Sequence, residues 1–192
     1  MKTLSPAAFT QRLYQSSLAL FTTKALRDLS GAAMPPATFF SLLSRLVKQS
    51  ILQRIERDKY LLVGATVHDF RIANFLYEPS YVSLEAALNF HGILPQFPYE
   101  IASVTPKKPV AKTWDGKTYR YARIKQSLFW GYDLAHGFLI AQPEKALLDL
   151  LYLQSKGLAV VHLDEFDLSK LDRQRLAAYA SRFPPMKGVD FL

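Results

Sequence analysis

The segment at residues 35–63, PPATFFSLLSRLVKQSILQRIERDKYLLV, constrains the fold of this chain more than any other. Its first half repeats apolar side chains at spacings of three and four, and Pro36 stands where a helix tolerates proline, at its start. The pieces ILQRI and KYLLV are rich in strand-favouring residues, and ERD between them is typical of a short hairpin loop. The segment therefore predicts a helix followed directly by a two-stranded hairpin.

The predicted helix has two faces of different composition. The apolar side chains that share one face are Phe39, Phe40, Leu42, Leu43, Leu46 and Val47. The polar side chains on the opposite face are Thr38, Ser41, Arg45 and Lys48. This polar face contains no Asp or Glu, whereas an ordinary solvent-exposed helix face usually mixes both signs of charge.

The residues before this segment predict two further helices. The first lies within residues 6–17. The second begins at Thr22 or Thr23, either of which can cap it, and ends at Gly31. Two helices, a turn at AAMPP, a third helix and a two-stranded ribbon are the layout of a winged helix-turn-helix.

Such a unit would place its third helix in the major groove of DNA, which admits one α-helix with short polar groups and a few long cations on its outer face. Hairpin cations would lie along phosphates, and the start of the second helix would meet the backbone across the groove. The residues predicted to contact DNA are Thr23, Lys24, Thr38, Ser41, Arg45, Lys48, Arg54, Arg57 and Lys59. Two alternatives stay open: an ordinary solvated helix face, and a winged helix that serves protein contacts only.

The distribution of charge supports a division of the chain. The 192 residues carry a formal net charge of +8, and 49% of them are hydrophobic, which is ample for a buried core. Residues 1–66 and 106–125 each have a balance of +6, whereas residues 67–105 have −3 and residues 126–192 have −1. Such a balance favours a polyanionic partner. We predict an α+β fold, with a winged helix-turn-helix at residues 1–66 and a mixed α/β domain at residues 67–192.

The second domain alternates helical and strand-like pieces. HDFRIANFLYEPS and YVSLEAALNFHGI predict helices, the latter with Ser83 as its cap and Gly92 as its stop. YEIASVT, KTYRYARIK, SLFWGYD and GFLIAQ are strand-like. PEKALLDLLYLQSKG is the strongest helical pattern, on which Glu144 and Asp149 are expected at surface or cap positions, and a last helix is expected at residues 170–182.

The central stretch TPKKPVAKTWDGKTYRYARIK interleaves cations with aromatic rings. Its basic side chains are Lys107, Lys108, Lys112, Lys117, Arg120, Arg123 and Lys125, and its rings are Trp114, Tyr119 and Tyr121. Cations can meet phosphates and rings can stack on bases, so the stretch is a candidate for a second nucleic-acid contact. The alternative is an alternating strand with its rings facing in and its charges facing out.

Several classes of site are excluded or disfavoured. The sequence has no cysteine, which excludes disulfides and thiolate metal sites. The histidines lack metal-ligand spacing, and the acidic residues beside His162 fit a polar turn better than a divalent-metal site. No P-loop, dinucleotide fingerprint or nucleophile elbow is present. We therefore expect no enzyme activity, no catalytic residue, no metal and no cofactor. Without a long apolar run or a secretory peptide, we also expect a cytoplasmic protein with no membrane contact.

Four phrases of the second domain resemble the AbiEi family, the antitoxin half of AbiE-type (type IV) toxin–antitoxin systems. These phrases are SYVSLEAAL, SVT, LFWGY and PEKALLDLLYL. They occur in the family's order and near its usual spacing, and the likeness covers roughly residues 10–155. Members of the family carry an N-terminal winged helix followed by an antitoxin domain, which is the division expected from charge and periodicity.

The resemblance implies a transcriptional repressor that binds inverted repeats in the promoter of its own operon, as part of a phage-defence system. It also implies antitoxin activity against a nucleotidyltransferase-like toxin, without a stable complex between the two. The family's DNA-contacting role falls on Thr38, Ser41, Arg45, Lys48, Arg54 and Arg57. The hairpin loop ERD departs from the family because it lacks the glycine often found there. The competing hypotheses are a protein-interaction module that neutralises a toxin by direct binding, and an enzyme that acts on nucleic acid or nucleotides.

Overall fold

The computed structural model describes residues 5–31 and 34–186. Over these residues the protein is a mixed α+β chain with seven α-helices and two β-sheets, which confirms the predicted α+β class. The chain separates into two compact units, Met1–His68 (unit 1) and Asp69–Leu192 (unit 2). The division predicted from the sequence followed residue 66. No helix within the described ranges is both long and apolar enough to cross a membrane.

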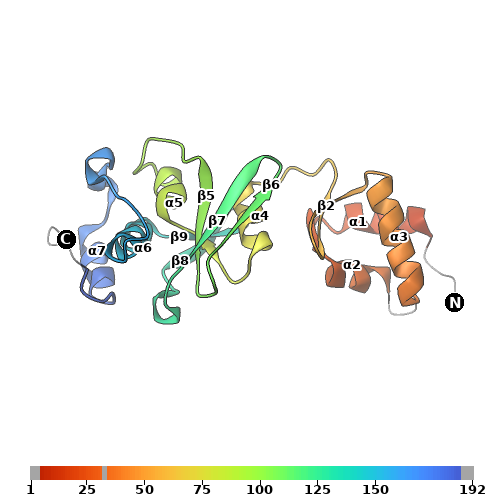
Figure 1. Ribbon diagram of the computed structural model, residues 1–192. Coiled ribbons are helices and arrows are strands. Elements are labelled where there is room, and N and C mark those ends of the chain that lie inside the picture. Colours follow the sequence, from red (N-terminus) through yellow and green to blue (C-terminus); the bar gives the residue numbers. More distant parts are fainter. Residues whose placement is uncertain (1–4, 32–33, 187–192) are drawn as a thin grey trace. The chain divides into compact units, whose positions relative to one another are not determined.

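Unit 1 contains three helices and one small antiparallel sheet (Figure 1). Its elements in chain order are α1 (Pro6–Gln15), β1 (Leu20–Thr22), α2 (Thr23–Ser30), α3 (Pro36–Lys48), β2 (Leu52–Glu56) and β3 (Lys59–Leu62). Strand β3 lies in the middle of the sheet, between β1 and β2. The three helices and the hairpin were predicted, whereas β1 was not.

Local side-chain chemistry explains where the first two helices begin and end. The Ser5 hydroxyl accepts a hydrogen bond from the Ala8 amide at 3.2 Å, and the Thr22 hydroxyl accepts one from the Ala25 amide at 3.1 Å. Each bond satisfies an amide that the helix itself leaves unpaired. Gly31, with a φ of 86°, ends α2. The turn predicted at AAMPP includes residues 32–33, which lie outside the described residues.

The core of unit 1 collects apolar side chains from the three helices and the sheet. Its buried members are Phe9, Leu13, Phe21, Leu26, Met34, Phe39, Leu42, Leu43, Leu46, Leu52, Tyr60 and Leu62. The prediction that Phe40 shares this face was wrong, because its side chain is 58% exposed. Successive helical residues are about 100° apart, so Phe40 lies at the edge of the arc that Phe39, Leu43 and Leu46 already fill.

Unit 2 is built around one six-stranded mixed sheet in the order β6-β7-β5-β4-β9-β8. The β5–β7 and β4–β9 pairs are parallel, and the other neighbours are antiparallel. Its helices and strands are α4 (Asp69–Leu76), β4 (Tyr81–Val82), α5 (Leu84–Phe90), β5 (Glu100–Thr105), β6 (Val110–Trp114), β7 (Lys117–Arg123), β8 (Tyr132–Ala135), β9 (Phe138–Ala141), α6 (Pro143–Ser155) and α7 (Arg173–Ala180). Short 3-10 turns lie at Gln126–Leu128, Leu163–Glu165 and Leu168–Lys170.

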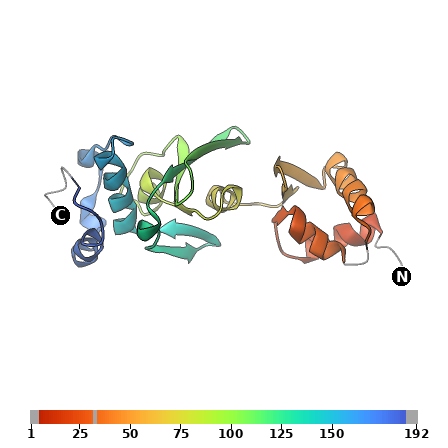
Figure 2. The same ribbon diagram turned by 60° about the horizontal axis from the view of Figure 1, so that its bottom comes forward.

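Helices cover both faces of this sheet (Figure 1 and Figure 2). On one face, the Tyr121 hydroxyl of β7 donates to the Ala73 carbonyl of α4 at 2.6 Å. On the other, the neighbouring Arg120 reaches Glu85 of α5 at 3.6 Å. Because side chains alternate along a strand, these two contacts place α4 and α5 on opposite sides. Helix α6 lies on the α5 side, where it packs against α5.

Helix α6 buries its charged residues as well as its apolar ones. The sequence predicted surface or cap positions for Glu144 and Asp149, but these residues are 2% and 0% exposed, and Lys145 is 0% exposed. The Lys145 ammonium contacts Asp149 Oδ1 and donates to the Tyr81 hydroxyl at 2.8 Å. The Tyr81 and Ser83 hydroxyls donate to Asp149 Oδ2 at 2.9 and 2.8 Å. The ion pair and these hydrogen bonds offset the desolvation of the two charges.

Aromatic rings and a glycine complete the surroundings of Lys145. Its ammonium lies 5.1 Å from the ring centres of Trp130 and Phe183 and 5.4 Å from that of Tyr81. A Cβ atom at Gly131 would lie only 2.9 Å from Lys145 Cγ, so glycine permits the close approach. Burial lowers the pKa of Lys145 and raises that of Asp149, while each charge opposes the shift of the other.

We predict that Lys145→Met destabilises the chain by about 3–5 kcal/mol at neutral pH, because it leaves the Asp149 carboxylate buried without its cation. Burial raises the pKa of Asp149 above its ordinary value. Protonation of this carboxyl therefore stabilises the folded state at low pH, and this stability is lost as the pH rises through the raised pKa. Urea unfolding at a series of pH values should show the variant losing stability, relative to wild type, as the pH rises above the ordinary aspartate pKa of about 4.

The control is the double variant Lys145→Met/Asp149→Leu, which removes both charges. It should cost less stability than Lys145→Met alone at neutral pH, and the added pH dependence should disappear. Equal or greater destabilisation by the double variant would show that the buried carboxylate is not the source of the cost.

Candidate nucleic-acid interface

The outer face of α3 presents the polar side chains that the sequence predicted for it. Thr38, Ser41, Arg45 and Lys48 are all exposed. The opposite face is held by the buried Phe39, Leu43 and Leu46, which fixes the rotation of the helix about its axis. Residues 35–48 contain no acidic side chain, so this face carries positive charge without internal neutralisation.

The start of α2 is tied to the turn of the β2–β3 hairpin. The Thr23 amide donates to the Asp58 carbonyl at 3.0 Å, and the Thr23 hydroxyl donates to Asp58 Oδ1 at 3.1 Å. Thr23 therefore already uses both of its donors within unit 1, while Lys24 beside it is exposed. The two bonds hold the hairpin in place relative to α2.

The hairpin turn adopts a left-handed conformation without glycine. Asp58 has a φ of 63°, and Asp is among the few non-glycine residues that adopt such angles at moderate cost. The absence of glycine from ERD was interpreted as a departure from the usual loop, but the aspartate in ERD can itself adopt the left-handed conformation that this turn requires. A shift of register between Arg54 and Glu56 adds a local bulge to the ribbon.

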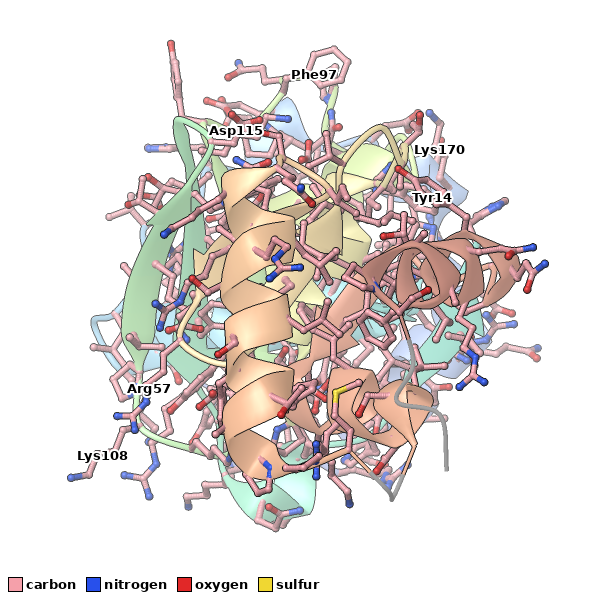
Figure 3. The ribbon with its side chains drawn as sticks, turned by 90° about the vertical axis from the view of Figure 1, so that its right-hand side faces the viewer. Tyr14, Arg57, Phe97, Lys108, Asp115 and Lys170 are labelled. Atoms are coloured by element: carbon pink, nitrogen blue, oxygen red, sulfur yellow. The ribbon has the colours of Figure 1, made fainter. Side chains whose placement is uncertain are left out.

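The three hairpin cations differ in how far they project. The side chain of Arg57 is 88% exposed and lies 3.7 Å from Asp58, while Arg54, also exposed, donates to the Glu56 carbonyl at 3.3 Å. Lys59 is half-buried and pairs with Glu56 at 3.4 Å. Figure 3 shows α3 facing the viewer, with Arg57 to one side of it and Tyr14 of α1 to the other. Arg57 and Arg54 can thus extend the cationic surface beside α3, whereas Lys59 contributes less.

The central basic stretch is not one patch in the structure. Strand alternation places Lys117 and Lys112 on the α4 face of the sheet and Arg120 on the α5 face. Lys117 pairs with Asp69 at 2.7 Å, and Arg120 pairs with Glu100 at 2.9 Å.

Two more of these cations donate hydrogen bonds to backbone carbonyls. The Lys112 ammonium donates to the Leu76 carbonyl at 2.9 Å, and that of Lys107 donates to the Glu78 carbonyl. Lys108, Arg123 and Lys125 are exposed.

Two of the three aromatic rings of the same stretch face inward, while Trp114 is half-buried. Tyr119 and Tyr121 are 0% and 1% exposed, and burial together with Asp69 raises the pKa of the Tyr119 hydroxyl. Neither tyrosine can stack on a base from this position. The alternating strand that the sequence analysis kept open describes these residues better than a stacking surface does.

No group of three or more potential ligands that could hold a metal ion occurs among the described residues. One member of the acidic cluster beside His162, Asp167, is engaged in other contacts. Asp167 accepts hydrogen bonds from Ser169 and pairs with Lys170 at 3.6 Å. These bonds, with the Lys170 charge, lower the pKa of Asp167.

The sequence was also compared with known proteins. No family model matches the chain, and no curated protein matches it.

We predict that Asp58→Ala speeds solvent exchange of the Thr23 amide about fivefold. Alanine loses the side-chain bond to Thr23 and costs about 1 kcal/mol or more in the left-handed conformation of this turn. Hydrogen exchange followed by NMR on the full chain measures the change. Asp58→Asn, which keeps both the acceptor and the tolerance for this conformation, should exchange like wild type; equal rates in all three proteins would contradict the predicted role of the turn.

Proposed function

We propose that the protein is a DNA-binding repressor of the AbiEi antitoxin type, with unit 1 acting as a winged helix-turn-helix. The observation that carries the proposal is the exposed, acid-free polar face of α3 beside a cationic hairpin. Unit 1 supplies the matching order of elements, α1-β1-α2-α3-β2-β3. In this arrangement α3 would enter the major groove, and the hairpin would follow the phosphates as the wing.

The proposed ligand is double-stranded DNA containing inverted repeats in the promoter of the protein's own operon. Arg45 would read a base edge, because a guanidinium can bond two acceptors of guanine at once. Ser41 and Thr38 would bond bases or phosphates nearby, and Lys48 and Arg57 would contact phosphates. Of the central basic stretch, only the exposed Lys108, Arg123 and Lys125 are well disposed to contribute.

The proposed antitoxin role assigns counteraction of a nucleotidyltransferase-like toxin to unit 2, in the cytoplasm and without a stable complex. We propose that the protein acts by binding, and not as an enzyme. In support, the polar network most similar to a catalytic cluster, formed by Tyr81, Ser83, Lys145 and Asp149, is buried. Its ionisable groups are bonded to one another.

The test of DNA recognition is a gel-shift titration of the full chain against its own promoter at several salt concentrations. Arg45→Ala should weaken specific binding by about 1–3 kcal/mol. Lys48→Ala should lower the salt slope by about 1 with little change in sequence preference. Lys156→Ala, which removes the same charge from the exposed residue that follows α6, serves as the control and should bind like wild type.

The repressor proposal fails if the wild-type chain shows no preference for its own promoter over an unrelated duplex. If preference is present but Arg45→Ala and Lys156→Ala behave alike, α3 is not the reading element.

A second candidate function, direct binding of the toxin, is favoured by a groove on unit 2. The cavity has a volume of about 200 Å³, and its apolar lining includes Phe97, Tyr99, Val160 and Phe166. Phe97, Tyr99 and Val160 are 88%, 105% and 77% exposed. Exposed apolar groups that gather around a cavity mark interaction sites. Figure 3 shows Phe97 projecting outward.

The charges around this groove indicate what it would bind. The described lining contains the carboxylates Glu85 and Glu165 and no Lys or Arg, although the chain has a net charge of +8. Glu85 forms an ion pair with Arg120 at 3.6 Å, so Glu165 is the main uncompensated charge among the described lining residues. The occupant would be a basic segment of the toxin with one large apolar side chain, because DNA would be repelled here.

Co-expression with the product of the neighbouring gene tests this candidate. A stoichiometric complex should form with the wild type and be lost in Phe97→Ser/Tyr99→Ser. Leu134→Ser, which removes a 73% exposed leucine from β8, should leave the complex intact. The absence of a complex, or its survival in the double variant, would contradict direct binding through the groove.

A further inference from the structure

One large aromatic side chain of the proposed DNA-reading helix is exposed, although the sequence pattern predicted that it would lie on the core face. Phe40 is 58% exposed, in the first half of α3. Residues near the start of a recognition helix are those that meet base edges in helix-turn-helix proteins. The position of Phe40 is therefore that of a potential reader.

The neighbours of Phe40 along the helix explain why more than half of its side chain stays exposed. Ala37 lies one turn before it and Ser44 one turn after it, and both are small and exposed, while Leu43 on the core side is buried. Neither of the two small side chains is long enough to fold over the ring. The ring also contacts that of the buried Phe39 edge to face, with centres 5.3 Å apart. This contact orients the ring before any ligand binds.

The edges of base pairs in the major groove carry one prominent apolar group, the 5-methyl of thymine. A phenyl ring offers no donor or acceptor to other base-edge groups and no charge to phosphates. It also cannot stack on a base while the duplex stays paired. We propose that Phe40 packs against a thymine 5-methyl group and so makes the protein require thymine at one position of its site. This inference rests on the proposed function of unit 1.

The experiment separates the methyl group from the rest of the base. The full-length chain is used to select binding sites from a random duplex pool at physiological salt. Each thymine of the selected site is then replaced, one at a time, by deoxyuridine, which lacks only the methyl group. We expect one position at which this change weakens binding about fourfold, the value for losing one buried methylene-sized group.

Two protein variants identify the side chain responsible. Phe40→Ala should bind the thymine and deoxyuridine forms of that position equally. Tyr14→Ala removes an aromatic ring of similar exposure, 57%, from α1 and should keep the wild-type ratio. Circular dichroism of both variants checks that each is folded. Replacing the thymine by cytosine should weaken wild-type binding, and 5-methylcytosine should recover part of the loss because it restores the methyl group.

The outcomes distinguish this inference from the function on which it rests. If sites are selected but no deoxyuridine replacement matters, or if Phe40→Ala keeps the wild-type ratio, the thymine contact is wrong while the repressor proposal stands. If no site is enriched, both fail together.

Discussion

The burial of one arc of α3 is the constraint on which the proposed interface depends. Phe39, Leu43 and Leu46 are at most 5% exposed, and they anchor the helix in the core of unit 1. A helix held along one arc has no freedom to rotate, so Ser41 and Arg45 must face outward. The same constraint leaves Phe40 exposed, because Phe39, Leu43 and Leu46 occupy the buried arc and Phe40 lies at its edge. Core packing therefore determines which side chains are offered to a ligand.

Equal positive charge in two segments has different consequences in the folded chain. Residues 1–66 and 106–125 each have a balance of +6. On α3 the cations face solvent without acidic neighbours on their own helix. In the central stretch, Lys117 and Arg120 meet carboxylates, and Lys112 meets a backbone carbonyl, on both faces of the sheet. The distribution of charge along a sequence indicates where a polyanion could bind. In a strand, the alternation of side chains then determines which of those cations stay accessible to the polyanion.

The features that sequence could predict are those set by local chemistry. Periodicity and capping residues gave the three helices and the hairpin of unit 1, and strand alternation described Tyr119 and Tyr121 in unit 2. The strand β1, the sheet orders and the burial of Asp149 were not predictable in this way. They depend on partners far along the chain: Asp149 accepts hydrogen bonds from residues 66 and 68 positions away. Ser83 occupies the predicted cap position of α5, but its hydroxyl bonds Asp149 instead of capping the helix.

Three of the phrases on which the proposed AbiEi type rests meet around one buried ion pair, Lys145–Asp149. SYVSLEAAL supplies Tyr81 and Ser83, LFWGY supplies Trp130 and Gly131, and PEKALLDLLYL supplies Lys145 and Asp149 itself. Their residues depend on one another, since a change in any of them disturbs the burial of the same ion pair. Such a network stabilises the architecture of unit 2, and its buried residues cannot touch a partner. A partner can meet only surface residues, such as those on the outer face of α3 and in the groove beside Phe97.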